Sequence, residues 1–106
     1  MRMWMTNPKL MCRKHLLGEH VECHMFVGTI NKQISVIGYL EKNLLEVSSL
    51  NTRHDELAKE MMERGYHHYT PLPFYPLVSE VKIDRNKASE ELYSRCDECR
   101  KLKEKL

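Results

Sequence analysis

The sequence predicts an all-α fold in one domain that spans residues 1–106. Three stretches, near 8–26, 52–65 and 84–103, combine apolar side chains at helical spacing with residues that favour helix ends. Residues 29–37 have the β-branched composition of a strand, but no other stretch offers a partner, so we expect an extended linker there. The hydrophobic fraction of 42% and the charged fraction of 30% are those of a globular chain with a single core. We therefore expect three main helices and one short helix, joined by long irregular connections.

The amino-terminal arm and the first helix carry the functional interpretation. Pro8 is suited to a first helical turn, and the helix is expected to run to about Phe26, with Gly28 closing it. Three apolar residues near the start are expected to pack the arm onto the body, namely Trp4, Leu10 and Met11. Gly18, in the middle of the helix, is typical of a place where another backbone approaches closely.

Helical geometry divides this first helix into a polar face and an apolar face. At 100° per residue, an imidazole and two carboxylates share one face, namely His15, Glu19 and Glu22. Three apolar residues fall on the opposite face and are expected to be buried, namely Leu17, Val21 and Met25. The polar cluster can hold a proton, a metal ion or another cation, or it is an ordinary solvated helix face. The spacing alone leaves these interpretations open.

The later elements have clear start or end signals. A short helix is expected over 39–47. Thr52, with Asp55 three residues later, is suited to cap the next helix, and Gly65 is suited to end it in a left-handed conformation. The prolines of residues 70–76 exclude a helix there and predict a stiff connection.

Two patterns have the spacing of metal ligands. Cys96-x-x-Cys99 has the spacing of a zinc-binding pair, but no second pair of the same kind accompanies it. Both sulfurs fall on the apolar stripe of the helix expected over 84–103, so we expect core thiols. His20 and His24 are four residues apart on one helix, but the longer motifs that use this spacing are absent. We therefore expect packed or surface histidines and no metal site.

Composition and missing motifs exclude several classes of function. No apolar run approaches the roughly 20 residues of a membrane span, and the amino terminus lacks the pattern of a signal peptide. We therefore expect an intracellular protein whose four cysteines are thiols. The net charge of +2 is too small for overall charge to drive nucleic-acid binding, which would need a local basic patch. No P-loop, dinucleotide-binding or serine-hydrolase motif is present.

Three segments share the features of one known family. They are the run Lys14-His15-Leu16-Leu17-Gly18-Glu19-His20-Val21-Glu22, the short arm with Arg2, and Arg53-His54-Asp55-Glu56-Leu57 followed by Glu63-Arg64-Gly65-Tyr66. Together they resemble the pyrimidine-dimer DNA glycosylases. The resemblance extends over residues 1–28 and 51–66 and is thin elsewhere. It is the combination of the segments that is specific.

The resemblance implies a defined chemistry. In this family a free terminal α-amine attacks C1′ of a damaged nucleotide, displaces the base and leaves an imine to the opened sugar. A glutamate of the first helix then assists β-elimination at the abasic site. Carried over, the amine is that of Met1, which we expect to be retained because Arg2 is large, and the glutamate is Glu22. An α-amine has an ordinary pKa of about 7.7–8, so a sizeable fraction is neutral and nucleophilic near neutral pH. No metal or other cofactor is needed.

The same resemblance and the local charge predict the contacts with DNA. Six residues are expected beside the nucleophile, on the same helix face or at the flanking phosphates, namely Arg2, Lys9, Arg13, Lys14, His15 and Glu19. The expected partner is damaged double-stranded DNA, and a monomer is expected for a chain of this size. It would act in the cytoplasm, nucleoid or nucleus, or inside the host cell if a virus encodes it.

Alternatives to this interpretation stay open. One is a non-catalytic helical DNA-binding or interaction module on the same scaffold, and another is a zinc-stabilised helical module, which metal at Cys96 and Cys99 would favour. The lesion is also open. A phage enzyme of the family has arginines where this chain has Val21 and Met25, and an aromatic basic tail where this chain is rich in lysine and glutamate. A pyrimidine dimer, another base lesion and an abasic site alone all remain candidates.

Overall fold

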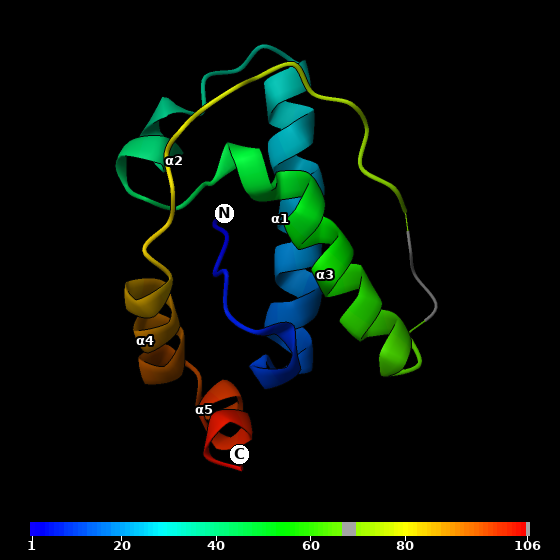
Figure 1. The fold of residues 1–106 in the computed structure, drawn as a ribbon, viewed down its shortest axis with the longest axis vertical. Coiled ribbons are helices and arrows are strands. Elements are labelled where there is room, and N and C mark those ends of the chain that lie inside the picture. Colours follow the sequence, from blue (N-terminus) through cyan, green and yellow to red (C-terminus); the bar gives the residue numbers. More distant parts are fainter. Residues whose placement is uncertain (67–69, 106) are drawn as a thin grey trace.

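A computed structural model describes residues 1–66 and 70–105, and this part of the chain is all-α, as the sequence predicts. The α-helices are α1 (Arg13–Asn31), α2 (Ile37–Glu41), α3 (Leu50–Glu63), α4 (Arg85–Arg95) and α5 (Asp97–Glu104), with 3-10 turns η1 (Pro8–Leu10) and η2 (Val47–Ser49). The long helix α1 crosses α3, and the amino-terminal arm runs between α1 and α4 (Figure 1). None of the helices described is both long and apolar enough to span a membrane.

The core lies where α1, α3 and the arm meet. Its buried side chains include Met3, Trp4, Met11, Leu16, Cys23, Phe26, Val27, Leu57 and Met61. The predicted packing of the arm is therefore confirmed for Trp4 and Met11, whereas Leu10 is only half-buried. Met3 and Trp4 are buried in the core, whereas Met1 and Arg2 are half-buried, and the amino terminus lies between α1 and α4 in the view of Figure 1.

The predicted apolar face of the first helix is wrong for Val21 and Met25, whereas Leu17 is half-buried and packs against the core. Val21 is 53% exposed and Met25 is 48% exposed, while Glu19, on the face predicted to be polar, is only 1% exposed. The reason is a buried ion pair, in which the Arg53 side chain donates two hydrogen bonds to the Glu19 carboxylate, at 2.6 and 2.9 Å. A carboxylate can leave water only when its charge is compensated in this way, and the partner on α3 lies 34 residues away in the sequence.

Removal of Arg53 is expected to destabilise the protein strongly. Arg53→Ala leaves the Glu19 carboxylate buried without a cation, which should lower the free energy of unfolding by about 3–5 kcal/mol, measured by urea denaturation. Arg95→Ala is the matched control, because Arg95 pairs with Glu91 on the surface and its side chain is 64% exposed. Arg95→Ala should lower the free energy of unfolding by less than about 1 kcal/mol. Equal losses in the two variants would contradict this account of the buried pair.

Several helix boundaries differ from the predicted ones. The first helix continues past Gly28 to Asn31, and so takes up the start of the linker predicted over 29–37. The short helix α2 ends at Glu41, well before the predicted end. The residue before α3 is Ser49, so Thr52 lies inside that helix and does not cap it. These boundaries are set by tertiary contacts that override local preference.

Other predicted ends are confirmed. Gly65 has φ +86°, the left-handed conformation that favours glycine after a helix. Asp84 accepts a hydrogen bond from the backbone N–H of Lys87 at 3.0 Å and so caps α4. The last helix, however, is not continuous over 84–103. It breaks at Cys96, an extended residue that ends α4 and also precedes α5.

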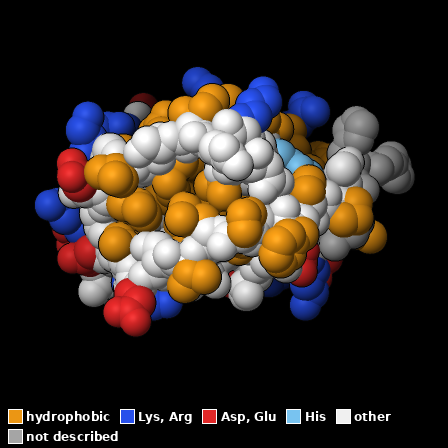
Figure 2. Space-filling model, turned by 90° about the horizontal axis from the view of Figure 1, so that it is seen from above, with side chains coloured by type: hydrophobic (Ala, Val, Ile, Leu, Met, Phe, Trp, Pro, Cys, Tyr) orange, Lys and Arg blue, Asp and Glu red, His pale blue; other side chains and the backbone are white. Residues whose placement is uncertain are grey.

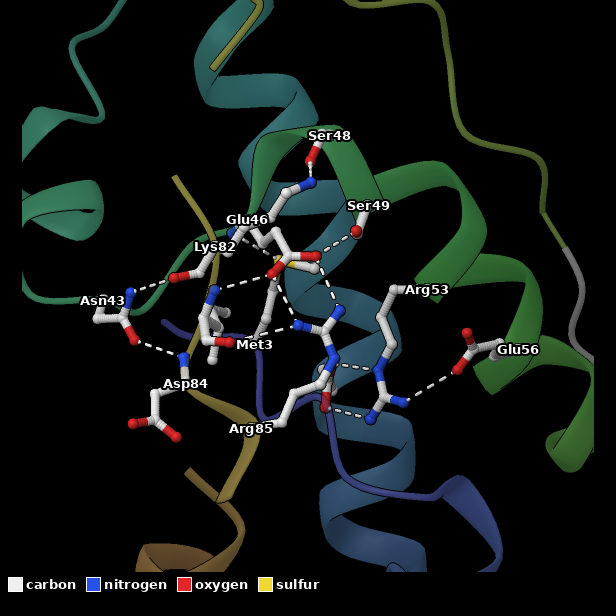
Figure 3. Close-up of polar contacts among 12 residues, drawn as sticks. Met3, Asn43, Glu46, Ser48, Ser49, Arg53, Glu56, Lys82, Asp84 and Arg85 are labelled. Atoms are coloured by element: carbon white, nitrogen blue, oxygen red, sulfur yellow. Dashed lines mark hydrogen bonds and ion pairs between the residues drawn. The ribbon is translucent and has the colours of Figure 1, made fainter. Parts of the chain in front are cut away.

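A polar network holds the arm against two loops (Figure 3). The backbone N–H of Met3 donates to the carbonyl of Leu44 at 2.8 Å, and the N–H of Glu46 donates to the Met3 sulfur at 3.3 Å. The buried Glu46 carboxylate accepts a hydrogen bond from the backbone N–H of Ile83 at 2.8 Å and another from Arg85 at 2.9 Å. The two hydrogen bonds of Met3 fix the position of the arm against the loop that contains Leu44 and Glu46.

Hydrophobic side chains gather at the end of the molecule that carries the end of α1 and the connection from α3 to α4 (Figure 2). Exposed residues of these segments include Ile34, Ile37, Phe74 and Val78. A pocket of about 340 Å³ lies here, lined in part by Ile30, Val36 and Leu77. The β-branched stretch after α1 therefore forms an apolar surface rather than a strand.

Candidate active site

The arm and the start of α1 enclose a pocket of about 290 Å³. Its lining residues all come from the first 22 positions, namely Met1, Arg2, Trp4, Lys14, His15, Gly18, Glu19 and Glu22. Six of the residues predicted from the sequence to act on DNA thus line one pocket. The other two predicted residues, Lys9 and Arg13, lie outside it.

Met1 and Glu22 are neighbours in this pocket. The Met1 side chain packs against the hydrophobic core, which gives a large first residue a place and leaves its α-amine at the pocket. Burial raises the pKa of Glu22 above its ordinary value. A hydrogen bond from the backbone N–H of Arg2 and the positive charge of the α-amine both act in the opposite direction. The carboxylate is therefore partly desolvated and lies close enough to the chain terminus for the terminal charge to affect its pKa.

Arg2 is held by protein groups on both sides. Its guanidinium forms an ion pair with Glu91 of α4 at 2.9 Å and lies 3.9 Å from the centre of the Trp4 ring. Within the described part of the chain, its buried Nε has no hydrogen-bond partner. The ion pair therefore anchors Arg2 to α4. Because Met1 is bonded to Arg2, its position is restricted as well.

His15 joins the pocket to a group of cysteines. Its Nδ1 lies 3.2 Å from the Cys12 sulfur and 3.7 Å from the Cys99 sulfur, and the Trp4 ring meets it edge-on, with 5.9 Å between ring centres. Burial, together with the positive charge of Lys14, lowers the pKa of His15. The imidazole is therefore neutral at neutral pH.

Glu19 and Gly18 form the wall of the pocket. The Glu19 carboxylate is buried and paired with Arg53, so its charge is already neutralised by the protein. The sequence points to Arg53 only through the segment 53–57, which resembles the family. Its distance along the chain from Glu19 gives no sign that it neutralises this carboxylate. A Cβ at Gly18 would meet no atom within 4 Å, so no second backbone approaches there and the glycine leaves open space.

Lys9 and Arg13 lie on neighbouring surfaces. Lys9 pairs with Glu60 at 3.5 Å and Glu63 at 3.2 Å, and its side chain is 69% exposed. Arg13 is exposed, and its guanidinium lies 5.3 Å from the centre of the Tyr66 ring. Lys9 lines a different pocket, formed by η1 and α3. Its exposed ion pairs contribute at most about 1 kcal/mol and leave the ammonium accessible.

Two clusters in the described chain have donors for a metal ion. One is formed by His20, His24 and His54, and the other by Cys12, His15, Cys96 and Cys99. In the histidine cluster both ring nitrogens of His54 already face oxygen acceptors, Asp55 at 3.0 Å and the Thr70 carbonyl at 2.8 Å. Metal binding there would compete with these hydrogen bonds, so the histidine cluster is the weaker of the two.

Comparison with known proteins identifies one related group. A family model described as pyrimidine dimer DNA glycosylase matches residues 1–73, which include the arm, α1, α3 and every residue that lines the pocket. No curated protein and no solved structure matches the chain.

Proposed function

Because this chain belongs to the pyrimidine dimer DNA glycosylase family, we propose that it excises a damaged base from duplex DNA and then cleaves the strand at the abasic site. The observation that supports this proposal most strongly is the shared pocket of Met1 and Glu22. A terminal amine and a partly desolvated carboxylate are the two groups that such a reaction needs.

The proposed reaction begins with the neutral Met1 amine. Its nitrogen forms a bond to C1′, the bond from C1′ to the base breaks, and the base leaves with the electron pair. Opening of the sugar ring then gives a protonated imine. Glu22 takes a proton from C2′, and the 3′ C–O bond breaks, which releases the phosphate and cuts the strand. The Glu22 carboxylate also stabilises the cationic imine, because it lies in a partly desolvated pocket.

The basic residues around the pocket are suited to hold the DNA backbone. Lys14 lines the pocket, and the side chains of Lys9, in η1, and Arg13, at the start of α1, are exposed. Phosphate contacts of this kind position a duplex without reading its sequence. Arg2, which is paired with Glu91, positions the nucleophile more than it contacts phosphate. The open space at Gly18 offers room for the sugar of an extruded nucleotide.

Strand cleavage on three matched duplexes tests this function. One duplex carries a single abasic site, one carries a single pyrimidine dimer, and one is undamaged. We expect cleavage at the abasic site and at the dimer and none of the undamaged duplex. Cleavage at the abasic site alone would support the lyase chemistry and point to a different base lesion. No cleavage of either damaged duplex by folded protein that binds DNA would contradict the proposal.

A further inference from the structure

Two ends of the chain bring four metal-binding side chains together. Cys12 precedes α1 and His15 lies in its first turn, while Cys96 precedes α5 and Cys99 lies in its first turn. Their sulfur and nitrogen donor atoms all lie within 4.8 Å of one another. The sequence pattern is thus a Cys-x-x-His pair facing a Cys-x-x-Cys pair. From this juxtaposition we infer that these four residues form a structural zinc site.

The distances between the donor atoms fit a tetrahedral zinc ion. Zinc binds sulfur at about 2.3 Å and imidazole nitrogen at about 2.0–2.1 Å, so two ligands of one ion lie about 3.5–3.8 Å apart. The sulfurs of Cys12 and Cys96 are separated by 3.8 Å, and the Cys99 sulfur lies 3.7 Å from Nδ1 of His15. Nδ1 of His15 lies 3.2 Å from the Cys12 sulfur. An ion would fit between the donors after movements of a fraction of an ångström.

Backbone N–H groups donate to two sulfurs of the cluster. The N–H of Cys12 donates to the Cys99 sulfur at 3.2 Å, and the N–H of Cys99 donates to the Cys96 sulfur at 3.5 Å. Hydrogen bonds to ligand atoms stabilise the charged sulfur and fix its orientation in metal sites. The break between α4 and α5 at Cys96 serves the same arrangement, because a continuous helix would place this residue differently.

The donor set selects zinc and a structural role. Three thiolates and one imidazole in a tetrahedron are typical of structural zinc, and all four positions are filled by the protein, which leaves no place for a substrate. The ion would join the start of α1 to α5, next to the pocket that His15 also lines. The site would therefore hold the two ends of the chain together and fix one wall of the pocket. It does not depend on the proposed reaction with DNA.

Metal analysis of the wild-type protein, purified without a metal-chelating tag, tests the site directly. We expect about one zinc ion per chain, and a lower melting temperature after a chelator removes it. Replacement of zinc by Co²⁺ should give the visible absorption of a tetrahedral ion and a strong near-ultraviolet sulfur-to-cobalt band. This measurement reports thiolate ligands without any substitution, so it does not depend on whether variants fold.

Two cysteine variants then locate the ion. Cys96→Ser should lose most of the bound zinc and weaken the cobalt spectrum, whereas Cys23→Ala should keep both. Cys23 is the matched control, because it is the cysteine outside the cluster and is buried among other core residues. Folded wild-type protein that holds no zinc and takes up no Co²⁺ would overturn the inference. A disulfide between Cys12 and Cys96, detected as a mass loss of about two hydrogens, would overturn it as well.

Discussion

Glu22→Gln is expected to slow strand cleavage at an abasic site by about 10²–10⁴-fold, the usual contribution of a positioned acid or base. Glutamine has the same shape and can still accept the hydrogen bond from the Arg2 backbone, but it cannot take a proton from the sugar. Single-turnover cleavage of a duplex with one abasic site measures the effect. Glu41→Gln, at an exposed glutamate that ends α2, is the matched control and should cleave like the parent.

The stability of the same variant separates a catalytic role from a structural one. Burial raises the pKa of Glu22, so ionisation of this carboxylate costs more free energy in the folded protein than in the unfolded chain. At neutral pH this difference lowers the stability of the folded protein. Glu22→Gln should therefore melt at or above the temperature of the parent at neutral pH. The difference should shrink as the pH falls through the raised pKa, because the folded parent then takes up a proton. A variant that folds and cleaves as fast as the parent would contradict the role of Glu22.

Extension of the chain before Met1 is expected to abolish cleavage altogether. A preceding residue converts the α-amine to an amide, whose nitrogen lone pair is delocalised and does not attack carbon. The experiment uses a removable amino-terminal fusion, cleaved by a protease that leaves Met1 as the first residue. The fusion should bind the abasic duplex without cutting it, and removal of the fusion should restore cleavage. Full activity of the intact fusion would exclude the α-amine as the nucleophile.

The pocket could be predicted from the sequence because its lining residues lie close together along the chain. Met1 and Arg2 belong to one arm, and Lys14, His15 and Glu22 belong to one helix that begins a few residues later. Helical spacing places side chains of this kind on one face without knowledge of the rest of the fold. The resemblance to the family further predicts that the terminal amine lies near this face of the helix.

The burial of Glu19 could not be predicted in the same way. Periodicity treats a glutamate as a surface residue, and only the approach of Arg53 from α3 reverses that preference. Glu19 lies on the buried face of α1, whereas Val21 and Met25 lie on the exposed face. The buried face of α1 also carries apolar residues at helical spacing, namely Leu16, Cys23, Phe26, Val27 and Ile30. The ion pair with Arg53 lets Glu19 lie among them.

Cys99 lies in the core as predicted, but the approach of Cys12 and His15 to it could not be predicted, for a related reason. Cys96 and Cys99 were expected to be core thiols because only one pair with zinc spacing is visible in the sequence. The second pair, Cys12 and His15, is separated from the first by about 80 positions, and one of its members is a histidine. Contacts between the two ends of a chain cannot be read from local patterns, and the break at Cys96 is visible only once the ends are packed together.

Borohydride trapping on a duplex with one abasic site tests the central claim most directly, because reduction turns an imine into a stable bond. We expect a covalent complex of one chain with the cut strand, and peptide mapping should place the bond on the Met1 amine. Glu22→Gln should still form a covalent complex, now with the uncut strand, since the imine precedes the step assigned to the carboxylate. An adduct on a lysine such as Lys14, or no adduct from folded protein that binds the duplex, would contradict α-amine catalysis.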